Sequence, residues 1–206
     1  MLYEDFTKLE QLALGKGKFK ALCEEKSWVT QNLKPTISLR DYQKEAIGRF
    51  EYYWNGYLAK ESPKHLLYNM ATGSGKTVVM AALILDLYGK GYRNFLFFTR
   101  LGNIVTKTKL NLVRELSSKF LFAETLSFDG TPVSVKEVNT FAGASDSNIN
   151  ILFTTTGNLH DKLNNPSENS LTFEDFRRLK VCLIADEAHN LTADTRKRIN
   201  FQEMEL

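Results

Sequence analysis

The sequence has few of the features that would tie it to a membrane or an oxidising compartment. Its 206 residues contain only two cysteines, Cys23 and Cys182, which lie far apart in the chain. The N-terminal residues are partly acidic and include no apolar segment of signal-peptide length. No stretch approaches the roughly 20 apolar residues that cross a bilayer. We therefore expect a cytoplasmic protein with no membrane contact, in which Cys182 is a buried free thiol.

Strong charge imbalance, internal repeats and long low-complexity tracts are also missing. The formal net charge is +3, which permits nucleic-acid binding without requiring it. Hydrophobic residues make up 43% of the chain, a normal content for a packed core. This length and composition predict one sizeable α/β domain, or one such domain with an extension.

Short apolar runs alternate with helical patterns along most of the chain. Such alternation is typical of a mostly parallel sheet that is covered by helices on both faces. Residues 1–36 are expected to form a separate, polar helical extension, and residues 37–206 the main domain. Strands are predicted at 66–69, 95–99, 151–155 and 181–185, with a weaker pattern at 132–138, and helices near 41–60, 77–88, 103–118 and 173–179.

The strongest pattern is Met-Ala-Thr-Gly-Ser-Gly-Lys-Thr at residues 70–77, with apolar runs on both sides. A strand, this loop and a helix form the context that a phosphate-binding loop requires. Glycines let backbone N–H groups converge on an anion, and the helix adds the positive end of its dipole. We expect Lys76 to contact the β- and γ-phosphates and the Thr77 hydroxyl to ligate Mg²⁺. The strict pattern has glycine where Met70 stands. The predicted nucleotide-binding residues of the loop are Thr72, Gly73, Ser74, Gly75, Lys76 and Thr77.

Two acidic residues follow the last apolar run of the chain. Asp186 comes directly after residues 181–185, at the carboxyl edge of the predicted sheet, where ligands bind in parallel α/β folds. ATP hydrolysis needs one carboxylate for the Mg²⁺ ion and another to orient the attacking water. We therefore predict that Asp186 holds the metal and that Glu187 is the catalytic base. The alternative is a plain helix N-terminus, where the dipole favours acidic residues.

Motifs around this pair resemble those of a known group of motor proteins. Residues 186–189, Asp-Glu-Ala-His, resemble motif II of DEAH-type superfamily 2 helicases and translocases. Leu-Arg-Asp-Tyr-Gln at residues 39–43 resembles the glutamine motif of that superfamily, which would place Gln43, with Arg40, on the adenine base. An exposed helix residue is the alternative for Gln43. The resemblance implies a three-layer RecA-like P-loop domain that uses ATP and Mg²⁺, with His189 coupling the ATP site to nucleic acid.

Two further segments resemble the superfamily more loosely. Residues 98–100 resemble motif Ia, and residues 154–159 resemble motif Ib without its usual proline and arginine. In the superfamily both motifs contact backbone phosphates. The resemblance thus implies nucleic-acid contacts by Thr99, Arg100, Thr155 and Asn158. A helix N-cap or a plain loop is the alternative for each segment.

Within the superfamily, the loop together with the glutamine motif is similar to the motor subunits of restriction enzymes. Only about 35 residues precede the glutamine motif, too few for the nuclease that type I motor subunits carry there. The similarity therefore favours the Res subunit of type III systems, site-specific deoxyribonucleases whose nuclease follows the motor. It implies double-stranded DNA, a second RecA-like domain and a modification (methyltransferase) subunit as partners.

The sequence predicts an ATP-binding motor domain of a DNA helicase or translocase. A second RecA-like domain supplies an arginine finger in such motors, so the chain ending at Leu206 is expected to bind nucleotide and turn it over near background. Two alternatives stay open: an RNA helicase domain and a non-catalytic ATP-binding module.

Overall fold

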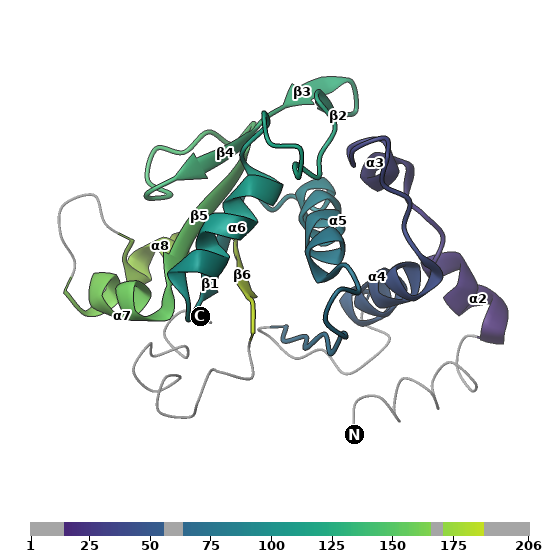
Figure 1. Cartoon of the computed structure of the whole chain (residues 1–206), viewed down its shortest axis with the longest axis horizontal. Coiled ribbons are helices and arrows are strands. Elements are labelled where there is room, and N and C mark those ends of the chain that lie inside the picture. The colour runs from purple at the N-terminus through teal and green to yellow at the C-terminus, as the bar shows by residue number, and fades with distance from the viewer. Residues whose placement is uncertain (1–14, 56–63, 166–170, 188–206) are drawn as a thin grey trace.

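A four-stranded parallel sheet forms the centre of the molecule (Figure 1). The computed structural model describes residues 15–55, 64–165 and 171–187. Every pair of neighbouring strands in this sheet runs parallel, so each connection has to cross over one face of the sheet. The strands, in spatial order, are β4 (Val135–Val138), β5 (Ile149–Thr155), β1 (Asn94–Thr99) and β6 (Val181–Ala185).

Helices cover both faces of this sheet, which gives three layers. Successive side chains of a strand point to opposite faces. Phe95 and Phe97 of β1 accordingly join one buried cluster, whereas Leu96 and Phe98 join another. This arrangement confirms the predicted α/β fold with a mostly parallel sheet. The first cluster lies under α5 (Lys76–Gly89) and α6 (Gly102–Leu112), and the second lies under α7 (Thr156–Asn164) and α8 (Phe173–Arg178).

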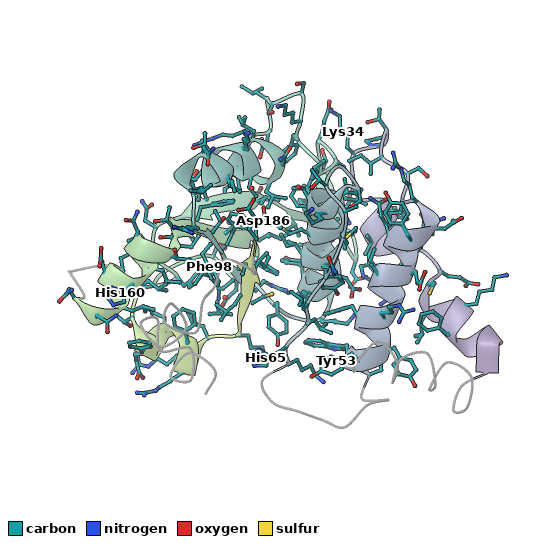
Figure 2. All side chains as sticks on the ribbon, turned by 60° about the horizontal axis from the view of Figure 1, so that its bottom comes forward. Lys34, Tyr53, His65, Phe98, His160 and Asp186 are labelled. Atoms are coloured by element: carbon teal, nitrogen blue, oxygen red, sulfur yellow. The ribbon has the colours of Figure 1, made fainter. Side chains whose placement is uncertain are left out.

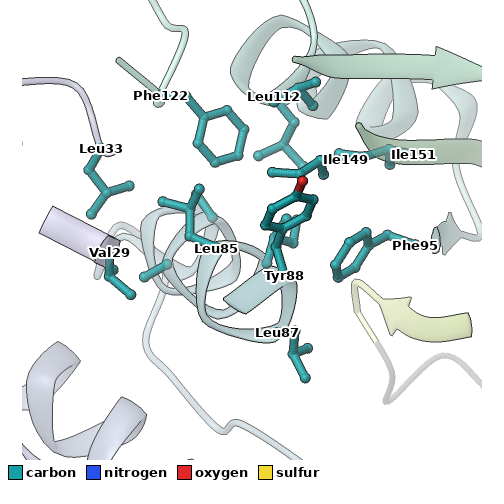
Figure 3. Close-up of a cluster of buried hydrophobic side chains, with 14 of the residues drawn as sticks. Val29, Leu33, Leu85, Leu87, Tyr88, Phe95, Leu112, Phe122, Ile149 and Ile151 are labelled. Atoms are coloured by element: carbon teal, nitrogen blue, oxygen red, sulfur yellow. The ribbon is translucent and has the colours of Figure 1, made fainter. Parts of the chain in front are cut away.

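Helix α5 is the most deeply buried helix of the part that the structure describes. Ala81, Ala82, Ile84 and Leu85 have no exposed surface, although they point in different directions around the helix. A helix that is apolar on most sides needs neighbours on most sides. Figure 3 shows the buried cluster around its C-terminal half. The helix is enclosed by the sheet, α6, α3 (Ser27–Thr30) and α4 (Asp41–Trp54), with α2 (Gly15–Leu22) packed on α4.

The last residues of the N-terminal segment belong to the main core. Val29 and Leu33 are each 2% exposed and lie in the cluster around α5, and Leu33 forms a β-bridge with Phe122. The polar character of the segment led us to expect a separate extension. Val29 and Leu33 instead pack as part of the domain. The exact domain boundary at residue 36 stays a prediction.

A buried group of charges fastens α5 to α4 and to the N-terminal segment. Lys26 and Lys90 each donate to both carboxylates, Glu51 of α4 and Asp86 of α5, at N–O distances from 2.6 to 3.2 Å. Burial raises the pKa of Asp86. Burial would also raise the pKa of Glu51, but the hydrogen bonds that its carboxylate accepts from Lys26 and Lys90 oppose burial, and the pKa is lowered to about 2. Because each carboxylate meets two cations, the charges can be buried together.

The strand predicted at residues 66–69 is absent from the structure. Leu66 and Tyr68 pack against the core, and Leu67 between them is 78% exposed, so the side chains alternate as in a strand. Residues 64–70 nevertheless have no hydrogen-bonded strand partner among the described residues, where β6 is the edge of the sheet. The prediction was wrong because side-chain alternation alone does not supply a neighbouring strand.

Several predicted boundaries also differ. Helix α6 ends at Leu112 instead of residue 118, since Leu116 is fully exposed and would gain no packing from a longer helix. The pattern at 132–138 divides into β4 and β3 (Thr131–Val133), which pairs with β2 (Leu126–Phe128) through a turn with positive φ at Asp129 and Gly130. The predicted end of the helix at residues 41–60 lies outside the described residues. None of the described helices has the length and apolar character needed to cross a membrane.

Candidate nucleotide site

The phosphate loop, residues 70–77, leads directly into α5. Gly73 and Gly75 have φ angles of 77° and 81°, in the left-handed region that favours glycine. Gly75 is the N-cap of α5, and a Cβ atom there would lie 2.5 Å from Nε2 of Gln43. Because Gly75 has no side chain, its backbone can adopt the turn and α4 can approach it closely. The helix begins at Lys76, which directs its first N–H groups toward the loop.

The side chain of Lys76 folds back over the loop in this structure. Its Nζ atom donates to the carbonyl oxygens of Met70 at 3.1 Å and Ala71 at 3.3 Å. Ser74 closes the same turn, because its hydroxyl donates to the Ala71 carbonyl at 2.7 Å. To reach a phosphate, the ammonium group would have to exchange these neutral carbonyls for charged oxygens, which are stronger acceptors. Thr72 and Gly73 are exposed, and Thr77 is half-buried in the first turn of α5.

The first turn of α4 supports the loop from one side. Gln43 is 4% exposed, and its Nε2 group donates to the Ser74 carbonyl at 3.0 Å, while its Oε1 atom accepts from the Arg40 backbone N–H at 2.9 Å. Gln43 is thus not the exposed helix residue that the alternative interpretation required. Tyr42 also donates to the Ser74 carbonyl, at 2.8 Å, and accepts from the guanidinium group of Arg40 at 3.1 Å. No role was predicted for Tyr42 from the sequence; its position beside Gln43 was the available signal.

The acidic pair lies at the carboxyl edge of the sheet. Figure 1 shows that β1 and β6 end on the side of the sheet where α5 begins. The Asp186 backbone N–H donates to the Phe98 carbonyl at 3.1 Å, so Asp186 continues the ladder between β6 and β1; Figure 2 labels both residues. Glu187 then turns away with φ of 55°, an unusual value for a residue with a side chain, and its N–H donates to Oδ1 of Asp186 at 2.9 Å.

The four predicted nucleic-acid residues lie at the ends of two adjacent strands and in the first turn of α7. Thr99 of β1 is in register with Thr155 of β5. Thr99 is only 1% exposed, whereas Arg100, the next residue, is exposed. The Thr155 side chain accepts from the Asn158 backbone N–H at 3.3 Å and so caps α7, as the helix N-cap interpretation required. Arg100 and Asn158 are therefore the residues of this group that present exposed side chains.

Two remaining sequence predictions concern His189 and Cys182. His189 lies outside the residues that the structure describes. Cys182 is a free cysteine of β6, and burial raises the pKa of its thiol to about 12. A thiol with such a pKa stays protonated at neutral pH and is a poor nucleophile. The cysteine is therefore a packing residue of the sheet.

The fold and the loop together define a RecA-like P-loop domain of the helicase type. Residues 36–205 match the model of the family described as "Type III restriction enzyme, res subunit". The chain belongs to this family, as the resemblance of its motifs implied. It is also 44% identical over 137 residues to the probable type III restriction-modification enzyme HindVIP Res subunit of Haemophilus influenzae. The match covers 66% of this chain and 26% of that relative.

Proposed function

We propose that the domain binds Mg-ATP and acts as the first motor domain of a DNA translocase in a type III restriction system. The observation that carries this proposal is the phosphate loop with Lys76 at the edge of the sheet where Asp186 and Glu187 follow β6. Ligands of parallel α/β folds bind at this edge. Membership of the Res family favours DNA translocation over the other uses of a P-loop.

The chemistry of the side chains fits a magnesium nucleotide. A carboxylate and a hydroxyl are hard oxygen donors, the kind that Mg²⁺ prefers, and Asp186 and Thr77 would supply them. Bound Mg²⁺ would neutralise phosphate charge during hydrolysis. Lys76 would contact the β- and γ-phosphates, and the N–H groups of residues 72–77 would surround them. Glu187 would accept a proton from the attacking water.

The adenine base would lie near the first turn of α4. Arg40 is exposed, so its guanidinium group is available to a base. Gln43 already uses both ends of its amide within the protein, and it would read the base only by exchanging one of these contacts. We therefore propose Arg40 as the more accessible of the two base contacts predicted from the sequence.

Double-stranded DNA is the polymer that we propose for the motor, with a second RecA-like domain and a modification subunit as protein partners. The Haemophilus influenzae relative is the Res subunit of a probable type III restriction-modification enzyme, which supports this choice. The test is ATP turnover by the full-length protein in the presence of double-stranded DNA, single-stranded DNA or RNA. We expect double-stranded DNA to stimulate turnover most. Preferential stimulation by RNA would favour the RNA helicase, and no turnover with any polymer would favour a non-catalytic ATP-binding module.

Arg100 provides a second test of the nucleic-acid proposal. Because its exposed guanidinium group would contact a phosphate, Arg100→Ala should weaken binding to all DNA sequences and make the slope of log K against log salt shallower by about 0.9. Fluorescence anisotropy over a salt series measures this slope. Arg178→Ala removes another exposed arginine, on α8, and serves as the control for the loss of one positive charge. Equal slopes for the two variants would remove Arg100 from the DNA interface.

A further inference from the structure

We propose that Tyr42 is a positioning residue of the phosphate loop, whose hydroxyl fixes the peptide between Ser74 and Gly75 in the orientation that binds phosphate. This inference rests on the proposed nucleotide function. It assigns a role to a residue outside the loop and outside the acidic pair. It also separates two tasks that the first turn of α4 could perform, reading the base and shaping the loop.

The Ser74 carbonyl receives two hydrogen bonds from neighbouring residues of α4. The Tyr42 hydroxyl donates at 2.8 Å and the Gln43 amide donates at 3.0 Å. These bonds join segments that are about 30 residues apart in the sequence. A carbonyl oxygen has two lone pairs, so the two donors fill its normal capacity. The carbonyl is therefore held toward α4 by both residues.

The orientation of this carbonyl determines where the next N–H group points. A trans peptide is planar, and its C=O and N–H bonds point in opposite directions. With the Ser74 oxygen held against α4, the Gly75 N–H must point away from α4. Phosphate loops bind anions through N–H groups that converge on one point, and a carbonyl turned into that space would repel the anion. The Tyr42 hydroxyl thus prevents the peptide flip that would place an oxygen there.

Arg40 strengthens the contact without replacing it. Its Nη1 atom donates to the Tyr42 oxygen at 3.1 Å, so the hydroxyl accepts one bond while it donates another. Hydrogen bonds in such chains polarise one another. The Tyr42 side chain is among the exposed large apolar side chains, with 42% of its surface accessible. Removing its hydroxyl therefore leaves the core intact and removes two hydrogen bonds, the one to the Ser74 carbonyl and the one from Arg40; a ligand without a base tests the first of them.

A role in shaping the loop predicts an effect that does not depend on the base. Tyr42→Phe should weaken binding of Mg-ATP, Mg-GTP and magnesium tripolyphosphate by the same factor, roughly three- to tenfold, the size of one hydrogen bond. Isothermal titration calorimetry on the full-length protein measures all three affinities. The thermal midpoint without ligand should stay at the wild-type value. The matched control is Tyr88→Phe, which removes a hydroxyl that donates to the Ser147 carbonyl at 3.1 Å, near the far end of α5.

The possible results separate this inference from the proposed function. If the wild-type protein binds none of the three ligands, the proposed nucleotide site is wrong, and the proposed role of Tyr42 is wrong as well. If the wild type binds and Tyr42→Phe binds equally well, only the positioning role is overturned. A loss confined to ATP would make Tyr42 a base contact and would also overturn the proposal. A lower thermal midpoint with unchanged tripolyphosphate affinity would assign the hydroxyl a structural role instead.

Discussion

Replacing Lys76 by alanine is expected to weaken Mg-ATP binding by roughly 30- to 150-fold. The variant would lack the charge-assisted contact between the ammonium group and the phosphates, worth about 2–3 kcal/mol. Negative charge on the phosphates would then be uncompensated at the loop. The fold should survive, since Lys76 is only half-buried and its present partners are the backbone carbonyls of Met70 and Ala71. Isothermal titration calorimetry with ATP and Mg²⁺ gives the dissociation constant directly.

The control for this experiment is Lys107→Ala, which removes the same charge from an exposed position on α6. Any change caused by net charge alone would appear in both variants. Equal ATP affinity for the wild type, Lys76→Ala and Lys107→Ala would show that the loop does not bind phosphate. Unchanged thermal midpoints in the absence of ligand would exclude unfolding as the cause of a loss.

Glu187→Gln is expected to reduce ATP hydrolysis by roughly 10²- to 10⁴-fold, the usual contribution of a general base. The amide keeps the shape of the side chain but cannot accept the proton of the attacking water. ATP affinity should stay close to the wild-type value, because Asp186 and Lys76 would still hold the metal and the phosphates. Single-turnover hydrolysis by the full-length protein with double-stranded DNA measures the rate, and calorimetry measures the affinity.

The unusual backbone at Glu187 makes this variant informative. Its φ of 55° lies in a region that side-chain-bearing residues rarely occupy, and such strain often marks functional sites. Glutamine is expected to tolerate that backbone as glutamate does. Glu174→Gln on α8 makes the same chemical change at an exposed site and should leave hydrolysis unchanged. Wild-type turnover by Glu187→Gln would assign the base to another residue.

The sequence predicted three of the four strands of the central sheet closely. Residues 95–99, 151–155 and 181–185 were expected as strands, and β1, β5 and β6 follow those limits to within two residues. Parallel strands buried on both faces consist of nearly continuous apolar residues, which is a strong local signal. Residues 66–69 carry a similar signal but form no strand, because a strand also needs hydrogen bonds to a neighbouring strand, and this segment makes none among the described residues.

The candidate site likewise has features that the sequence predicted and features that it did not. The glycines at 73 and 75 were readable from the sequence, since a tight turn with positive φ requires them, and the lysine that follows completes the phosphate-loop pattern. The burial of Thr99 was not readable, because it depends on the neighbouring strands and not on the residues beside it. The contact between Tyr42 and Ser74 was equally hidden, since it joins two turns that are far apart in the chain.

Residue types and their spacing were enough to assign the class of this protein: an α/β domain with a phosphate loop and the motifs of the type III restriction Res family. These features are local, because spacing and residue type fix turns, helix starts and runs of buried side chains. The packing of the elements was needed to see that α4 holds the loop through Tyr42 and Gln43, and that Val29 and Leu33 join the core. These contacts depend on how separate elements pack, and hydrophobic pattern alone does not specify which polar groups meet.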